Sequence, residues 1–454
     1  MKKNIFLSGV AAIALCAACQ SPKPAETVHL KGQLIDMGTN PVTMSYNGAA
    51  SMLGDSRNIL FHTDENGYFD TIISLKEPTY FNISRNTLYL TPGDDMTVYI
   101  TTNNQEANFQ GVGAQANNYM KYRLFPKGGS YLKGGRNIRG DFEETKALVD
   151  SLAEIRRNEL SQLDSVSEEF KMLESARIQA DVLNSYFSYV SYANIYSRED
   201  SRETMQQKYN DFMQKAAPYA KAIYPSLMDE KLLNVAVVRD VLHNLFDKEN
   251  VSWTEGLDIP ARTRELYEAY NYISLLRRQA DKATVDSVET FAASMQQPDF
   301  ANELKLKVEQ VARLLPGKPA FDIKMTDIEG NTHRLSEFKG KVLYLDFWAT
   351  WCGPCIQQSP HFEALSKEYA GKDILFIPIS QDTNLKAWKD FLGAHKKELP
   401  QYNSVDNNAH TNWQIFYIPR FVVIDKDFNI VNAYAPVPSD KEAIKAILDP
   451  LTEK

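Results

Sequence analysis

The chain of 454 residues contains little cysteine, with only four cysteines in all. Cys16 and Cys19 lie near the N-terminus, and Cys352 and Cys355 are separated by two residues. So few cysteines exclude a disulfide-rich scaffold, which needs several long-range bridges. They also argue against a zinc site of four nitrogen or sulfur ligands, because no two of the seven histidines are separated by three to five residues.

The sequence also lacks an excess of basic residues. Lys and Arg number 50 against 58 Asp and Glu, and the formal net charge is −8 at pH 7. Nucleic-acid-binding proteins carry a basic patch or stripe, so no nucleic-acid partner is expected. With 43% hydrophobic and 24% charged residues the chain has the composition of a soluble protein with a core. Its length predicts about three domains.

Long hydrophobic runs are missing except at the N-terminus. Two lysines precede an apolar segment over residues 5–15, which is too short to span a bilayer comfortably. Two alanines then precede Cys19, and this order resembles a bacterial lipoprotein signal, whose cysteine becomes the lipidated first residue. We expect a signal peptide over 1–18, lipidation at Cys19 and a tether over 19–26. Plain secretion is the alternative, and either signal exports the chain.

Residues 27–115 alternate between short apolar strands and turns. An Asn-Gly pair at 66–67 is a hairpin signal between two of these strands. Short strands at this spacing predict a small antiparallel, β-sandwich-like domain. No catalytic constellation is visible in it, so we interpret it as a structural or partner-binding module.

Helical periodicity extends over residues 116–315. Apolar residues recur three and four positions apart between 148 and 170, with one step missed, which predicts a mainly α-helical region. A stripe of tyrosines follows, at Tyr186, Tyr189, Tyr192 and Tyr196. Such a stripe either binds a partner or packs in a core, and helical spacing favours the core. A basic, glycine-rich loop over 127–139 lacks the context of a phosphate loop and is interpreted as a linker.

Residues 316–454 form a third, α/β unit. A buried strand over 342–347 leads into a Trp-Cys-Gly-Pro-Cys turn and a helix that ends near 370. A second buried strand covers 374–379, and a hairpin and a closing helix follow. This order predicts a mixed sheet flanked by helices.

The turn after the first buried strand carries the only cysteine pair outside the leader. A two-residue loop is a poor stabilising cross-link, because stabilisation grows with loop length. Both sulfurs of Cys352 and Cys355 lie on a first helical turn, where free N–H groups and the helix dipole favour a thiolate. The pair is therefore predicted to form a redox-active disulfide.

Several motifs in one order extend this interpretation. The run Asp-Phe-Trp-Ala-Thr-Trp-Cys-Gly-Pro-Cys at 346–355 is followed by Pro360 and by Ile-Pro at 418–419. Together they resemble the thioredoxin superfamily, and within it the exported TlpA/ResA-like disulfide reductases. The resemblance covers 316–454, while the upstream regions resemble accessory parts of Bacteroidetes-type thioredoxin-like lipoproteins. It implies a multidomain chain with a C-terminal thioredoxin fold.

The resemblance also implies roles for individual residues. Cys352 attacks a substrate disulfide, Cys355 resolves the mixed disulfide, and Asp346 takes or supplies the proton for Cys355, unless it simply pairs with a lysine. Pro419, in cis, presents the backbone of Ile418 to an extended peptide. The expected substrate-binding residues are Trp351, Gly353, Pro354, Ile418, Pro419 and Arg420. No cofactor or metal is expected.

Two positions depart from the family pattern. ResA-like proteins have glutamate where this chain has Gln358, so proton handling passes to Asp346. Arg420 replaces a frequent threonine, and its cation either lowers the pKa of Cys352, selects acidic partners or points to solvent.

Two other function classes compete with disulfide exchange. A peroxiredoxin usually has threonine three and proline seven residues before its catalytic cysteine, where this chain has Ala349 and Leu345. A binding module would use the fold only for docking. The Gly-Pro pair between the cysteines resembles reducing thioredoxins and favours a reductase. Its expected partners are disulfide-containing envelope proteins, a membrane-side electron donor and the membrane itself, through the lipid.

Overall fold

The computed structural model describes residues 26–37, 41–121, 138–246, 256–279, 281–404 and 407–453. The predicted signal peptide, Cys19 and most of the glycine-rich loop lie outside the described residues. The chain divides into two compact units. The first takes its residues from 1–44, 60–124 and 162–170, and the second from 45–59, 125–161 and 171–454. Within the described ranges, every helix is too short or too polar to cross a membrane.

Two four-stranded sheets form near the N-terminus, in the orders β4-β1-β7-β8 and β3-β2-β5-β6. Their strands are β1 (Thr27–Leu34), β2 (Val42–Tyr46), β3 (Ile59–Phe61), β4 (Tyr68–Ser74), β5 (Thr79–Ile83), β6 (Asn86–Leu90), β7 (Asp95–Ile100) and β8 (Asn108–Val112). Strand β1 pairs antiparallel with β4 but parallel with β7. This pair departs from the antiparallel domain predicted above, because the chain passes through the other sheet before it returns beside β1.

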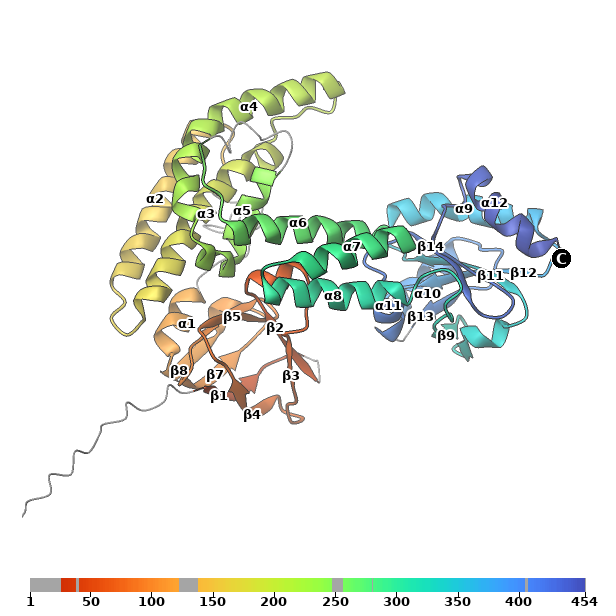
Figure 1. The fold of residues 1–454 in the computed structure, drawn as a ribbon, viewed down its shortest axis with the longest axis horizontal. Coiled ribbons are helices and arrows are strands. Elements are labelled where there is room, and N and C mark those ends of the chain that lie inside the picture. Colours follow the sequence, from red (N-terminus) through yellow and green to blue (C-terminus); the bar gives the residue numbers. More distant parts are fainter. Residues whose placement is uncertain are drawn as a thin grey trace, which may run out of the picture. The chain divides into compact units, whose positions relative to one another are not determined.

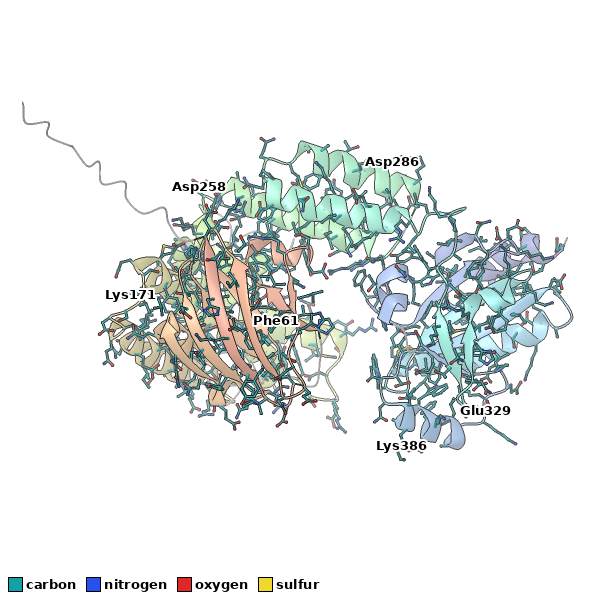
Figure 2. The ribbon with its side chains drawn as sticks, turned by 90° about the horizontal axis from the view of Figure 1, so that it is seen from below. Phe61, Lys171, Asp258, Asp286, Glu329 and Lys386 are labelled. Atoms are coloured by element: carbon teal, nitrogen blue, oxygen red, sulfur yellow. A yellow bond between two sulfur atoms is a disulfide. The ribbon has the colours of Figure 1, made fainter. Side chains whose placement is uncertain are left out.

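Helices dominate the middle of the chain (Figure 1). They are α1 (Ala114–Met120), α2 (Phe142–Ser161), α3 (Glu168–Tyr192), α4 (Arg202–Ile223), α5 (Ala236–His243), α6 (Ala261–Leu276), α7 (Lys282–Ser294) and α8 (Pro298–Ala312). Ser201 and Asp281 cap α4 and α7 by accepting a backbone N–H in the first turn. Helix α8 packs against α6 and α7, and Asp286 of α7 projects outward (Figure 2).

The tyrosine stripe divides between core and surface. Tyr186 and Tyr189 are buried and lie edge-on to Phe142, so the core interpretation is confirmed for them. Tyr192 and Tyr196 are exposed, and the core interpretation is wrong there. The reason is that α3 ends at Tyr192, so the periodic face is not continued.

The C-terminal sheet has the strand order β10-β9-β13-β12-β11-β14-β15. Its elements are β9 (Lys324–Asp327), β10 (Thr332–Arg334), β11 (Val342–Trp348), α9 (Gly353–Glu368), β12 (Ile374–Ser380), α10 (Leu385–Ala394), β13 (Tyr402–Ser404), α11 (Asn407–Trp413), β14 (Arg420–Ile424), β15 (Ile430–Ala435) and α12 (Lys441–Thr452). Central β11 runs parallel to β12 and antiparallel to β14, which confirms the mixed sheet. Lys386 of α10 points away from this core (Figure 2).

The central strand β11 is buried along its whole length, and its side chains pack in two hydrophobic clusters, one on each face of the sheet. Leu343, Leu345 and Phe347 pack on one face of the sheet. Val342 and Tyr344 pack on the other, together with residues of α9 and α12. Because side chains alternate along a strand, Asp346 lies on the same face as Tyr344, toward α9.

Candidate active site

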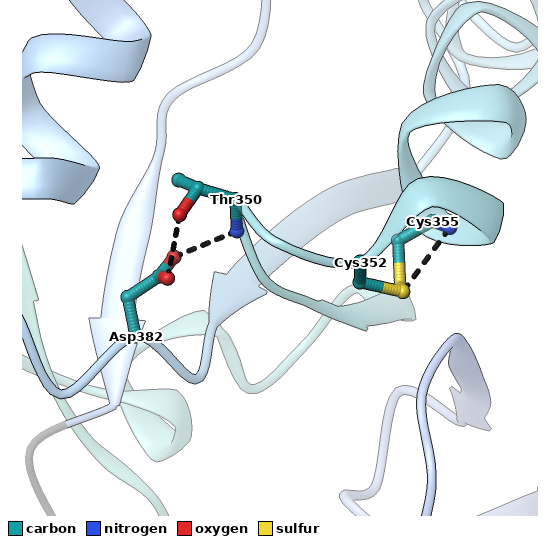
Figure 3. Close-up of a disulfide and its surroundings, with 4 residues drawn as sticks. All are labelled: Thr350, Cys352, Cys355 and Asp382. Atoms are coloured by element: carbon teal, nitrogen blue, oxygen red, sulfur yellow. Dashed lines mark hydrogen bonds between the residues drawn. A yellow bond between two sulfur atoms is a disulfide. The ribbon is translucent and has the colours of Figure 1, made fainter. Parts of the chain in front are cut away.

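The two cysteines form a disulfide where β11 hands over to α9 (Figure 3). Cys352 is the N-cap of α9, and its Sγ lies 3.2 Å from the backbone N of Cys355. Pro354 stands in the first turn, where a missing N–H costs nothing. Cys352 is 5% exposed and Cys355 1%, so both cysteines are buried in this oxidised form. Ile418 and Trp348 belong to the apolar cluster that covers it.

A buried carboxylate from the neighbouring strand anchors the turn before the cysteines. Thr350 donates its backbone N–H to Asp382 Oδ2 at 3.0 Å and its hydroxyl to Oδ1 at 2.7 Å (Figure 3). Ser380 also donates its hydroxyl to Asp382 Oδ2, at 2.8 Å. Asp382 is not among the site residues predicted from the sequence. Its signal is a carboxylate just after the second buried strand, because parallel β11 and β12 end at the same edge of the sheet.

Asp346 is buried, at 3% exposure, in a small cavity beside Cys355. Asp346 and Cys355 line one cavity of about 10 Å³, which is room for about one water molecule. The Oδ1 atom of Asp346 has no hydrogen-bond partner among the described residues. Burial raises the pKa of Asp346 to about 8, against the opposing effect of the Lys397 charge. A carboxyl with this pKa can accept or donate a proton near neutral pH.

Lys397 supplies the positive charge in the same cavity. Its ammonium donates to Ser359 Oγ at 2.5 Å and lies 3.8 Å from Glu363 Oε1. Within the described residues no ion pair joins it to Asp346, so the alternative that pairs Asp346 with a lysine holds only as a longer-range effect. Lys397 is not among the site residues predicted from the sequence, because it lies in a charged loop and no spacing links it to β11.

The loop before β14 meets the disulfide from the other side. The Ile418–Pro419 peptide bond is cis, as expected. Ile418 packs against the cluster that contains both cysteines. Phe416 and Tyr417 are exposed beside it. An apolar rim thus borders one side of the disulfide.

Trp351, at 72% exposure, is the most open aromatic residue of the turn. Gly353 and Pro354 are exposed with it at the start of α9. These positions suit contact with a substrate chain, and that role stays a prediction.

Arg420 does not belong to the exposed rim. It is 3% exposed, and its Nε donates to the Ala433 carbonyl at 2.6 Å. Its guanidinium carbon lies 3.1 Å from the centre of the Tyr434 ring. The solvent-facing alternative is therefore wrong, and direct contact with a substrate is not supported. The reason is that Arg420 begins β14, where its side chain lies across the adjacent strand β15.

Comparison with known proteins decides the family. A family model described as Redoxin matches residues 315–448. Thiol-disulfide oxidoreductase ResA of Bacillus cereus is 29% identical over 132 residues, which cover 29% of this chain and 72% of the relative. ResA of Geobacillus kaustophilus is 39% identical over 125 residues, which cover 27% of this chain and 60% of that relative. The C-terminal domain belongs to the TlpA/ResA-like thioredoxin superfamily.

The thioredoxin-like domain also matches a Bacteroides vulgatus protein described as a candidate thiol-disulfide oxidoreductase in its crystal structure. The two are 60% identical, over 31% of this chain and 99% of that one, with a TM-score of 0.30. The named relatives are thiol-disulfide oxidoreductases, and this protein is an oxidoreductase of the same superfamily.

The thioredoxin-like domain brings together most of the predicted site. Cys352, Cys355, Asp346 and Ile418 converge on the disulfide and its cavity. Gln358 does not line that cavity, because its Oε1 accepts the Ser439 N–H at 3.2 Å. Among the residues that line it, Asp346 and Glu363 carry the carboxyl groups.

Proposed function

We propose that the protein reduces disulfides of other proteins in the cell envelope by dithiol–disulfide exchange. The observation that carries the proposal is the Cys352–Cys355 disulfide at a helix N-terminus, with a protonatable Asp346 in the cavity beside Cys355. The names of the ResA relatives support the same chemistry.

The first step joins the enzyme to its substrate. The Cys352 thiolate attacks one sulfur of the substrate disulfide, the substrate S–S bond breaks, and a mixed disulfide forms. The released substrate sulfur leaves as a thiolate and takes a proton. The helix N-terminus favours the Cys352 thiolate because its free N–H groups point at the sulfur.

The second step releases the substrate. Asp346 accepts the proton of Cys355, directly or through one water in the 10 Å³ cavity. The Cys355 thiolate then attacks Cys352 Sγ, the mixed disulfide breaks, and the second substrate sulfur leaves as a thiolate, which takes up the proton that Asp346 accepted from Cys355. The enzyme is left with the disulfide drawn in Figure 3. The substrate has gained two electrons and two protons, and the enzyme has lost them.

A reductase must be reduced again after each turnover. We propose that a dithiol protein at the membrane supplies two electrons and two protons by the same exchange chemistry. The leader and Cys19 support a lipid-anchored location on the envelope side, and disulfide-containing envelope proteins are then the substrates. The strand-rich and helical regions over 27–115 and 116–315 are proposed as accessory domains to the thioredoxin-like domain over 316–454.

The Cys355→Ser variant tests the proposal, because it stops the reaction at the mixed disulfide. In cells, the variant should accumulate mixed disulfides with envelope proteins through Cys352, seen as bands that disappear on reduction. The Cys352→Ser, Cys355→Ser double variant is the matched control and should give none.

An insulin-reduction assay with the reduced wild-type protein completes the test. We expect reduction of insulin without consumption of peroxide. If the Cys355→Ser variant forms no mixed disulfides and the wild type consumes peroxide, the protein is a peroxidase. If the wild-type protein reduces neither insulin nor peroxide, it is a docking module.

A further inference from the structure

Two cations from the helical region lie beside the loop that meets the disulfide. The guanidinium carbon of Arg277 lies 5.2 Å from the centre of the Phe416 ring, and the ammonium of Lys307 lies 4.4 Å from it. Phe416 is 48% exposed, so the ring is covered only in part. Phe416 stands two residues before Ile418, which packs on the cysteine cluster, and two residues span at most about 7 Å.

Hydrogen bonds between the helices and the thioredoxin-like domain set these positions. Tyr434 of β15 donates its hydroxyl to the carbonyl of Leu276, the last residue of α6, at 3.1 Å. Lys307 of α8 donates to Gln414 Oε1 at 2.7 Å. The residue after α6 is Arg277, so both cations are held against the same loop.

Neither cation has an ion pair within the part of the chain that the structure describes. Lys307 bonds only to the neutral amides of Gln310 and Gln414. The Nε of Arg277 is buried and without a hydrogen-bond partner among the described residues. Burial and, after it, the Arg277 charge lower the pKa of Lys307 to about 8, and the charge of exposed Asp55 opposes them. The Lys307 ammonium and the Arg277 guanidinium repel each other, and a carboxylate of a bound partner would offset that repulsion.

We propose that Arg277, Lys307, Phe416 and Tyr417 form a recognition surface for substrate polypeptides that carry acidic residues next to their disulfide. Phe416 and Tyr417 would contact apolar parts of the substrate, and the two cations would attract its carboxylates. Charge complementarity selects this occupant, because the surface offers two cations and exposed aromatic rings. The inference rests on the proposed disulfide reduction and adds the class of substrate.

Matched disulfide peptides test the recognition surface. Three cyclic peptides differ only at two positions beside the cysteines, which hold Asp, Asn or Lys. In a single turnover, the reduced full-length protein should reduce the Asp peptide with a second-order rate constant about fivefold larger than that for the Asn peptide, and the Lys peptide more slowly still. The difference should shrink in about 1 M salt, because exposed charges are then screened.

Variants identify the cations responsible. Arg277→Gln with Lys307→Gln should abolish most of the preference for the Asp peptide. Arg278→Gln with Lys305→Gln is the matched control, since it removes the same net charge at exposed neighbouring positions. The control should keep the preference. Equal loss in both double variants would overturn the assignment, because net charge alone would then explain it.

The uncharged 2-hydroxyethyl disulfide separates this inference from the proposed function. All of these proteins should reduce it at the same rate, because it is too small and neutral to use the surface. If the wild type reduces it and reduces all three peptides equally, the recognition surface is wrong and the reductase stands. If the wild type reduces neither the small disulfide nor any peptide, disulfide reduction itself fails.

Discussion

At the scale of single residues, the chemistry depends on a carboxyl that the fold makes difficult to ionise. Asp346 lies in the middle of the sheet, next to Cys355 in a cavity with room for about one water. Burial raises its pKa to about 8. The same burial that makes it a useful base near neutrality therefore makes its charged form costly to the folded protein.

The Asp346→Asn variant should be more stable than the wild type at pH 8. A raised pKa means that between about 4 and 8 the folded state holds a proton that the unfolded state has lost, so wild-type stability falls as the pH rises through this window. Asparagine removes that dependence, and the gain should be on the order of 5 kcal/mol at pH 8 and near zero below pH 4. Urea unfolding of the oxidised proteins at several pH values measures it. Asp390→Asn, at an exposed position on α10, should leave the pH profile unchanged.

The same variant should slow the resolving step. Without a carboxylate to accept the Cys355 proton, release of substrate from the mixed disulfide should slow by about 100-fold at pH 7. Stopped-flow measurement with a labelled disulfide peptide separates this step from the attack by Cys352, which should keep its rate. Slowing of both steps to the same extent would contradict the role assigned to Asp346.

At the scale of elements, the turn between β11 and α9 is fixed by hydrogen bonds to a residue that follows the neighbouring strand β12. Asp382, just after β12, accepts two hydrogen bonds from Thr350, two residues before Cys352. The carboxyl ends of the two parallel strands thus fix the position of the cysteines, since hydrogen bonds to a buried charged group are strong.

Thr350→Val and Asp382→Ala should show coupled effects on stability. The hydrogen bond from the Thr350 hydroxyl to a charged acceptor contributes about 1.5–3 kcal/mol, and Asp382→Ala should cost more, because it also leaves the backbone N–H unpaired. A double-mutant cycle in urea should therefore give a coupling energy of about 1 kcal/mol or more. Purely additive effects would show that the turn does not depend on this pair.

At the scale of the whole molecule, helices α6 and α8 contact the thioredoxin-like domain close to the loop that carries the cis Ile418–Pro419 bond. The bond from Tyr434 to the Leu276 carbonyl holds the end of α6 beside β15. The guanidinium group of buried Arg420 also packs on the Tyr434 ring. This contact links the strand next to the active-site loop with a helix more than one hundred residues earlier in the chain.

The Tyr434→Phe variant should loosen that link. Loss of one hydrogen bond should cost about 1 kcal/mol of unfolding free energy. The preference for acidic peptides should fall with it, whereas reduction of 2-hydroxyethyl disulfide should not change. Peptide kinetics and urea unfolding on the same preparation check both effects. An unaltered peptide preference despite the lost stability would show that Arg277 is held in place by other contacts.

Local patterns in the sequence determined the elements that carry the redox site. A run that is apolar except at Asp346 predicts β11, because a strand buried on both faces needs apolar residues at nearly every position. The Cys-Gly-Pro-Cys turn, α9 and the Ile418–Pro419 bond follow from residues that are neighbours in the chain. Asp346 could be assigned to the site because its position is counted along the same strand as the turn.

Only the tertiary structure decided what surrounds that centre. Asp382, Lys397 and the pair Arg277 and Lys307 reach the site from other elements, and no sequence spacing relates them to the cysteines. The burial of Arg420 and the parallel pairing of β1 with β7 also depend on which strands become neighbours. Local sequence specifies strands, turns and helix starts, but long-range packing selects which polar groups share a cavity or a surface.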